Sequence, residues 1–252
     1  MPIPGFVEFE FDLSDALLAR LVEIFDSLPG APLAPAGVDE LPEAQGVYQL
    51  LLGDQVVYIG KTDAEAGLRN RLGRHARSIQ HRTNLDTANV TFKAVRVFVF
   101  TAMDLETQLI RHYGSPAWNF SGFGSNDPGR NRDKTKLKPE GFDATYPIDI
   151  DRPLDMEFPE GSTAAQIVTR LKSELPYTLR FELREGSRRI HPDFEAAQVT
   201  LPAAPRTVRT LVEAVIQALP AGWQATALPS RVIIYREATD YLYGNVIARK
   251  PA

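Results

Sequence analysis

The sequence predicts an α+β protein in which a small antiparallel sheet is flanked by helices and followed by a second, smaller α+β domain. Three observations support this prediction. Two runs rich in β-branched and aromatic residues are separated by a Gly-Asp turn signal, apolar stripes at helical spacing flank them, and helix-then-strand patterns recur after residue 160. The 252 residues are also enough for two domains.

The N-terminal stretch predicts an amphipathic helix from Leu13 to Leu28, with apolar residues at Leu17, Leu21 and Ile24. Residues 1–45 hold 9 acidic side chains and 1 basic side chain, so the outer face of this helix is acidic. We therefore expect this N-terminal acidic helical extension to pack on the core or across a dimer rather than to contact DNA.

A β-hairpin is predicted over residues 47–51 and 56–59, because the Gly-Asp pair between the two runs favours a tight turn. Tyr48 ends a Gly-Val-Tyr run on the first strand, and Tyr58 opens a Tyr-Ile-Gly run on the second. A tyrosine on a short strand is ordinarily a half-buried packing residue. The pair of tyrosines therefore needs support from the segments that follow.

Residues 66–81 predict a helix with an apolar stripe and an otherwise polar or basic surface. The stripe comprises Leu68, Leu72 and Ile79. Arg71 and His75 lie four residues apart, which places both side chains on one face, within reach of a single phosphate. Taken alone, the same helix is better described as a solvated basic face, because surface arginines are common.

The next segments predict a strand over residues 91–100 and a helix opened by a capping box at residues 101–104. Glu106 lies in the first turns of this helix, and Gly114 ends it. A glutamate near a helix start serves either the helix dipole or a functional site. Asn119 follows after a short connection.

In this order and at this spacing, the polar residues of the middle segment resemble the GIY-YIG nuclease superfamily, with Val47 in place of the isoleucine of the first half-motif. The resemblance covers residues 46–120. The matching positions are Tyr48, Tyr58, Gly60, Arg71, Glu106 and Asn119. With His75 one turn after Arg71 and the stretch 118–132, the chain is similar to the type II restriction endonucleases that cut CCGCGG, the SacII isoschizomer group. The C-terminal third is unmatched.

The resemblance implies a hydrolase, a DNA endonuclease that works as a homodimer on a palindromic site in double-stranded DNA. A companion DNA methyltransferase is a further candidate partner. Two alternatives stay open: a structure-specific or modification-dependent DNA repair or defence nuclease, and a catalytically inert DNA-binding protein. The inert protein is disfavoured, because it has no physical need for the full set of polar positions that phosphodiester cleavage requires.

The chemistry of phosphodiester cleavage assigns roles to these residues. Glu106 is the one carboxylate of the set, so it is the expected ligand of a hard cation, Mg²⁺ or Mn²⁺, with one metal per active site. The guanidinium of Arg71 suits phosphate oxygens and is expected to hold the scissile phosphate. Tyr58 is expected to orient water or phosphate, as the resemblance implies, and Asn119 to brace the site.

Tyr48 is the predicted general base, provided that nearby cations push the pKa of its phenol well below the ordinary value. Arg71, His75 and Lys61 are the candidates for that effect. His75 stays open as the alternative base, because an imidazole accepts a proton near neutral pH without such a shift.

Positive charge is concentrated in the middle of the chain. The net charge of the protein is −4, yet residues 46–138 hold 14 basic and 8 acidic side chains, a local charge of +6. Residues 129–138 form a Gly-rich basic run, which we expect to be a loop that orders on DNA; a flexible surface loop is the alternative. The predicted DNA contacts are Lys61, Arg74, Arg130, Asn131, Arg132, Lys134, Lys136 and Lys138.

The predicted organisation is an extension over residues 1–45, a nuclease core over 46–138, a linker over 139–160 and a C-terminal α+β domain of unknown role over 161–252. The elements predicted in the last domain are a helix from Ser162 to Leu175, a strand over 177–184, a helix from Thr207 to Leu219, and strands over 223–228 and 231–236. His191 has no Cys or His at ligand spacing and is predicted to be structural.

Composition favours a protein of the cytoplasm. The chain contains no cysteine, which excludes disulfides and thiolate metal sites. It has no apolar run long enough to span a bilayer, and its first residues lack the features of a signal peptide. We therefore expect no membrane association.

Overall fold

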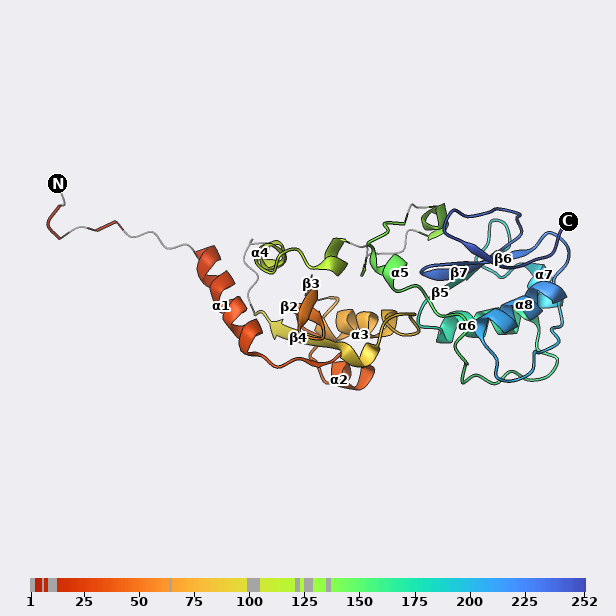
Figure 1. The fold of residues 1–252 in the computed structure, drawn as a ribbon, viewed down its shortest axis with the longest axis horizontal. Helices are drawn as coiled ribbons and strands as arrows, with labels where there is room; N and C mark the ends of the chain where they lie inside the picture. The colour runs from red at the N-terminus through yellow and green to blue at the C-terminus, as the bar shows by residue number, and fades with distance from the viewer. Residues whose placement is uncertain are drawn as a thin grey trace. The chain divides into compact units, whose positions relative to one another are not determined.

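The computed structural model describes residues 3–5, 7–8, 13–63, 65–98, 105–120, 123–124, 129–134 and 137–252. The chain divides into two compact units, Met1–Arg74 with Ala88–Phe120, and His75–Thr87 with Ser121–Ala252 (Figure 1). The predicted bounds are different in two respects. The division between the units falls within the helix Leu68–Ser78, and the basic run of residues 129–138 groups with the second unit. The predicted capping box at residues 101–104 lies outside the described residues.

The first unit confirms the predicted α+β class, with an antiparallel sheet in the strand order β1-β4-β2-β3. The strands are β1 (Ala31–Pro32), β2 (Gly46–Leu52), β3 (Gln55–Thr62) and β4 (Val90–Arg96). The β2–β3 hairpin turns at Gly53, whose φ of 58° lies in the left-handed region that glycine adopts without strain. The predicted hairpin is therefore confirmed.

One face of this sheet packs against the helices α1 (Leu13–Ser27) and α4 (Leu105–His112). Val47 on β2 and Ile59 on β3 are fully buried there. The apolar stripe of α1 contributes to the same cluster, so the predicted N-terminal helix packs on the core.

The helix α3 (Leu68–Ser78) contacts the other face of the sheet. Its residues Leu68 and Leu72 are buried, as their spacing predicts. A side chain at Gly46 would place its Cβ 2.9 Å from Leu68 Cδ1 and 2.4 Å from the carbonyl oxygen of Val95, so only glycine allows this close approach. The short elements of the unit are α2 (Pro35–Asp39), η1 (Thr87–Asn89) and η2 (Ala117–Phe120).

The second unit contains a mixed sheet in the order β5-β7-β6-β8. Its strands are β5 (Thr178–Phe181), β6 (Gln224–Leu228), β7 (Arg231–Tyr235) and β8 (Asn245–Arg249); β5 runs parallel to β7 and the other pairs are antiparallel. The helices α6 (Ala164–Glu174) and α8 (Val208–Ala218) bury their apolar faces in the core of this unit (Figure 1).

Three details of the second unit differ from the predictions. The cap of α6 is Thr163, not Ser162, because Thr163 and Gln166 form a reciprocal capping box. Residues 139–160, predicted as a linker, contribute Ile148, Ile150 and Phe158 to the core. The strand β8 was not predicted. The remaining elements are η3 (Gly129–Lys134), α5 (Phe142–Thr145) and α7 (Pro192–Ala196).

His191 has the structural role that the sequence predicts. Its side chain accepts a hydrogen bond from the backbone N–H of Asp193 and so caps α7. No helix among the described residues is long and apolar enough to cross a membrane.

Candidate active site

Tyr48 and Tyr58 lie together on the face of the sheet that α3 contacts. Tyr48 is fully buried and lies opposite Gly60 in the β2–β3 register, and its ring centroid is 6.1 Å from that of Tyr58. A Cβ at Gly60 would lie 2.4 Å from the hydroxyl oxygen of Tyr48. Gly60 is therefore required because the ring of Tyr48 crosses the strand at this position.

Arg71 on α3 completes this group. Its Nε donates a hydrogen bond of 3.3 Å to the hydroxyl oxygen of Tyr48. Burial by itself lowers the pKa of Arg71, but hydrogen bonds and charge interactions with Tyr48 and Tyr58 outweigh it and raise the pKa above its ordinary value. The guanidinium is therefore charged at every physiological pH. We call Tyr48, Tyr58 and Arg71 the phenol–guanidinium cluster.

The pKa of Tyr48 is shifted in the direction opposite to the prediction. Burial raises it, and so does the interaction with Tyr58; Arg71 lowers it, but by less than burial raises it. Arg71 therefore lowers the pKa of Tyr48 as predicted, but the effect of burial on this pKa is larger. At neutral pH the phenol of Tyr48 keeps its proton in the free protein.

Glu106 lies in the first turn of α4, where its carboxylate is 3.7 Å from Nζ of Lys61 on β3. The Glu106 side chain is 27 % exposed and the Lys61 side chain 46 % exposed, so both groups can be reached from solvent. Lys61 follows Tyr58 by three residues on the same strand. Strand β3 therefore carries both Tyr58 of the phenol–guanidinium cluster and the lysine that pairs with the carboxylate.

The donor set at Glu106 fits a hard divalent cation. Within the described part of the chain, no group of three or more His, Cys, Asp or Glu residues converges. A single accessible carboxylate suits Mg²⁺, which keeps several waters and commonly takes its remaining oxygens from a substrate phosphate. It does not suit a site that needs several protein ligands, such as structural zinc.

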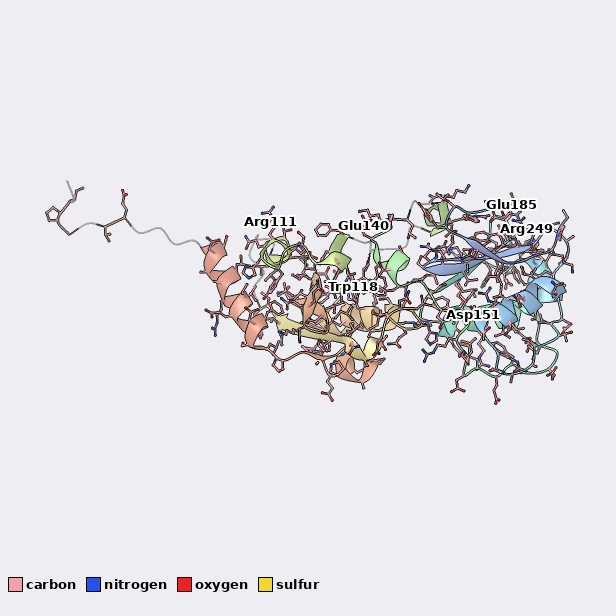
Figure 2. The ribbon with its side chains drawn as sticks, viewed as in Figure 1. Arg111, Trp118, Glu140, Asp151, Glu185 and Arg249 are labelled. Atoms are coloured by element: carbon pink, nitrogen blue, oxygen red, sulfur yellow. The ribbon has the colours of Figure 1, made fainter. Side chains whose placement is uncertain are left out.

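Asn119 on η2 binds the backbone of the edge strand β3. Its Oδ1 accepts a hydrogen bond of 2.9 Å from the N–H of Ile59, and its Nδ2 donates one of 2.7 Å to the carbonyl of the same residue. The adjacent Trp118 is buried beside β3 (Figure 2). Asn119 thus takes the place of a neighbouring strand and holds the segment that bears Tyr58.

His75 belongs to the second compact unit. It is 2 % exposed, and its ring stacks on that of Phe123 with centroids 4.8 Å apart and planes inclined by 18°. The neighbouring Arg74, a predicted DNA contact, is exposed.

The basic run 129–138 is anchored on the C-terminal sheet over η3, where a loop that orders only on DNA was expected. Arg130 pairs with Glu182 and Glu237 at 3.3 Å each, and its guanidinium lies 4.0 Å from the ring centroid of Tyr235. Its charge is thus already compensated by protein groups. The exposed members of the predicted DNA contacts in this run are Arg130, Asn131, Lys134 and Lys138, whereas Lys136 and the side chain of Arg132 lie outside the described residues.

Asp133 is the anchor of this run, and the sequence reasoning missed it. Its carboxylate is fully buried and accepts hydrogen bonds from Arg180 at 2.7 and 2.9 Å, from Arg231 at 3.4 Å and from the hydroxyl of Tyr235 at 3.0 Å. The signal in the sequence is a single acidic residue within a basic run. Its partners are arginines on strands much later in the chain.

A small antiparallel sheet bears the two tyrosines, one helix bears the arginine and a second helix bears the carboxylate, as the resemblance to the GIY-YIG nucleases implies. Residues 53–144 match the family model of the Eco29kI GIY-YIG domain. The matched segment includes Tyr58, Arg71, Glu106 and Asn119, and it begins after Tyr48. The match supports a domain like that of the GIY-YIG restriction endonucleases, and hence a nuclease that acts on DNA. Among curated proteins, no sequence matches the chain.

Proposed function

We propose that this protein is a Mg²⁺-dependent endonuclease that hydrolyses phosphodiester bonds in double-stranded DNA as a sequence-specific type II restriction enzyme. The observation that supports this best is the hydrogen bond from Arg71 to Tyr48 across Gly60, which joins a permanent positive charge to two phenols on a rigid sheet. Such a group can hold a phosphate and present a proton acceptor beside it.

Each residue has a proposed role. Arg71 binds the oxygens of the scissile phosphate, and Tyr58 orients the attacking water by a hydrogen bond. Tyr48, in its deprotonated form, takes the proton of that water at its hydroxyl oxygen as the water oxygen bonds to phosphorus. The bond from phosphorus to the 3′ oxygen breaks, and the leaving 3′ oxygen takes a proton from solvent. Glu106 holds the divalent ion, which when bound supplies positive charge next to the phosphate. Lys61 positions the carboxylate of Glu106.

The family match to a restriction endonuclease domain also motivates the finer parts of the proposal. We propose a homodimer on a palindromic site, of the group that cuts CCGCGG, acting in the cytoplasm on invading DNA with a companion DNA methyltransferase that protects the host. Because such a dimer presents two equivalent sites, each protomer cuts one strand.

Digestion of a supercoiled plasmid in the presence of Mg²⁺ tests this proposal. We expect discrete linear fragments from the wild type and a loss of about 10²–10⁴-fold in rate for Glu106→Ala and for Tyr48→Phe. Glu65→Ala, which removes an exposed acid, is the matched control and should cut at the wild-type rate.

Three results contradict the proposal. Cleavage confined to forked or modified DNA indicates a repair or modification-dependent nuclease. DNA binding without any cleavage indicates an inert protein. Cleavage by Glu106→Ala at the wild-type rate shows that Glu106 is not the metal ligand.

A further inference from the structure

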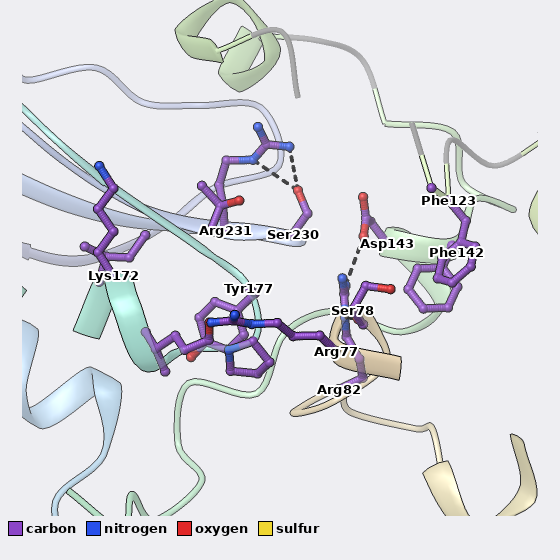
Figure 3. Close-up of a pocket in the computed structure, with 15 residues that line it drawn as sticks. Arg77, Ser78, Arg82, Phe123, Phe142, Asp143, Lys172, Tyr177, Ser230 and Arg231 are labelled. Carbon is purple, nitrogen blue, oxygen red and sulfur yellow. Dashed lines mark hydrogen bonds and ion pairs between the residues drawn. The ribbon is translucent and has the colours of Figure 1, made fainter. Parts of the chain in front are cut away.

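The second unit contains a cavity of about 430 Å³ that plays no part in the proposed cleavage (Figure 3). Its walls come from the last turn of α3 and the residues after it, from the segment that joins α6 to β5, and from the start of β7. The volume lies within the range of small-molecule sites, about 300–1,000 Å³.

The lining of the cavity is strongly basic. It contains the cationic side chains Arg77, Arg82, Lys172 and Arg231. Among the described residues that line it, Asp143 is the one acid, and Arg82 binds it at 2.9 Å. Arg231 pairs with Asp133 outside this lining, so the excess of positive charge that favours an anionic ligand comes from Arg77 and Lys172.

Arg77 is the cation best prepared for such a ligand. Its Nη2 donates to the carbonyl oxygens of Ser173 at 2.9 Å and Leu175 at 3.0 Å, which fixes the guanidinium at the rim. Within the described part of the chain, its Nε and Nη1 make no hydrogen bond. A planar guanidinium held on one side offers its remaining donors to phosphate without further loss of side-chain freedom.

Aromatic rings form the apolar part of the wall. The rings of Phe123 and Phe142 lie 4.5 Å apart, and that of Tyr177 lines the cavity as well. The hydroxyl of Tyr177 is buried and has no hydrogen-bond partner among the described residues. These rings are 2–8 % exposed, so they offer a nucleotide base an apolar surface to contact, and the cations beside them suit its phosphate.

We propose that this cavity binds a nucleoside monophosphate, with the phosphate at Arg77 and Lys172 and the base against the aromatic wall. Two sources can supply a ligand of this chemistry, namely a free nucleotide and a single nucleotide extruded from DNA. The site lies outside the phenol–guanidinium cluster and does not depend on cleavage.

Isothermal titration calorimetry of the full-length protein with deoxynucleoside monophosphates, without Mg²⁺, tests the proposal. We expect saturable binding that Arg77→Gln weakens by about tenfold or more, as for the loss of a charge-assisted hydrogen bond, and Lys172→Gln by less. Arg188→Gln removes an equal charge from an exposed position outside the cavity and should change nothing. The Glu106→Ala variant should bind like the wild type, which separates this inference from the proposed cleavage.

Two outcomes overturn the proposal. One is an absence of nucleotide binding, or binding that Arg77→Gln leaves unchanged while circular dichroism shows the variant folded. The other is inorganic phosphate binding as tightly as the nucleotide, because the aromatic wall then contributes nothing.

Competition with DNA distinguishes the two sources. A duplex with one bulged nucleotide that displaces the free nucleotide more strongly than a perfect duplex assigns the cavity to extruded DNA. Nucleotide binding that neither duplex displaces assigns it to a free nucleotide.

Discussion

Each of the two units builds a polar cluster around a buried tyrosine on its sheet, and the clusters differ in how their charge is balanced. In the first unit, Arg71 contacts Tyr48 and Tyr58, which are both phenols. In the second unit, Tyr235 shares the carboxylate of Asp133 with Arg180 and Arg231. The second cluster contains a carboxylate that offsets part of the charge of its two arginines, whereas the first cluster places a guanidinium against two phenols.

This difference separates a site for chemistry from a structural anchor. A buried carboxylate surrounded by arginines and a hydroxyl fixes the chain but offers little to a ligand. A guanidinium placed against phenols keeps its attraction for phosphate, and the buried phenol of Tyr48 can accept a proton beside it only once it is deprotonated. The anchor at Asp133 holds η3, and the phenol–guanidinium cluster is the group to which we assign the proposed cleavage.

Breaking the anchor should give the largest loss of stability. Asp133→Ala leaves Arg180 and Arg231 without their buried partner, and we expect the free energy of unfolding to fall by about 3–5 kcal/mol in urea denaturation. Asp151→Ala breaks the exposed pair with Arg209 and should cost less than about 1 kcal/mol. Equal effects of the two substitutions would show that burial of Asp133 does not matter.

Gly60→Ala tests the position of Tyr48 in the other cluster. The added methyl would lie 2.4 Å from the hydroxyl oxygen of Tyr48, so the ring must move away from Arg71. We expect cleavage to fall by about 100-fold, since a displacement of about 1 Å costs that much in catalysis. Gly73→Ala on α3 meets its nearest atom at 3.9 Å and should cut normally. Normal cleavage by both variants would separate Tyr48 from the chemistry.

The pH dependence of cleavage distinguishes the two candidate bases. Burial raises the pKa of Tyr48, and a general base acts in its deprotonated form, so its active fraction grows as pH rises. With Tyr48 as base, kcat/KM should rise by about tenfold per unit between about pH 7 and pH 9. A fluorinated tyrosine at this position, with a more acidic phenol, should shift the profile to lower pH. A plateau from about pH 7, with a dead His75→Ala variant, would assign the base to the imidazole.

Asn119→Ala should have the smallest effect of the four. It removes two hydrogen bonds to the backbone of Ile59, a fully buried residue, and we expect a loss of stability of about 1–3 kcal/mol with a modest drop in cleavage. The exposed Asn70 on α3 is the matched control, and Asn70→Ala should leave thermal unfolding unchanged. A stability loss as small as that of Asn70→Ala would mean that water replaces both bonds.

Much of the fold could be predicted because its signals are local. The Gly-Asp turn between two β-branched runs specifies the β2–β3 hairpin, and Thr207 caps α8 as its position predicts. The α6 cap was misplaced by one residue because Ser162 and Thr163 are both good caps, and the glutamine three residues after Thr163 decides between them. The exposed strand β8 carries little apolar alternation, so its pairing with β6 is a tertiary effect.

The sequence could predict that three residues of the candidate site lie together, but not the direction in which the pKa of Tyr48 shifts. The spacing of Tyr48, Tyr58 and Arg71 identifies residues that the structure brings together. Burial of Tyr48, which reverses the expected shift of its pKa, depends on the packing of a whole sheet and has no local signal. The pairing of Arg130 with Glu237 joins residues too distant in sequence for a charge count to reveal.

The side chain of Asn119 binds the edge strand β3 of the first sheet, and this affects how two copies of the chain could associate. An exposed edge strand has unpaired backbone groups, so a strand of a second chain can pair with it. Such pairing leads to aggregation as readily as to dimers. The amide engages both hydrogen-bonding groups of Ile59, so sheet extension at that position is blocked. The proposed homodimer would therefore not form by sheet extension at Ile59.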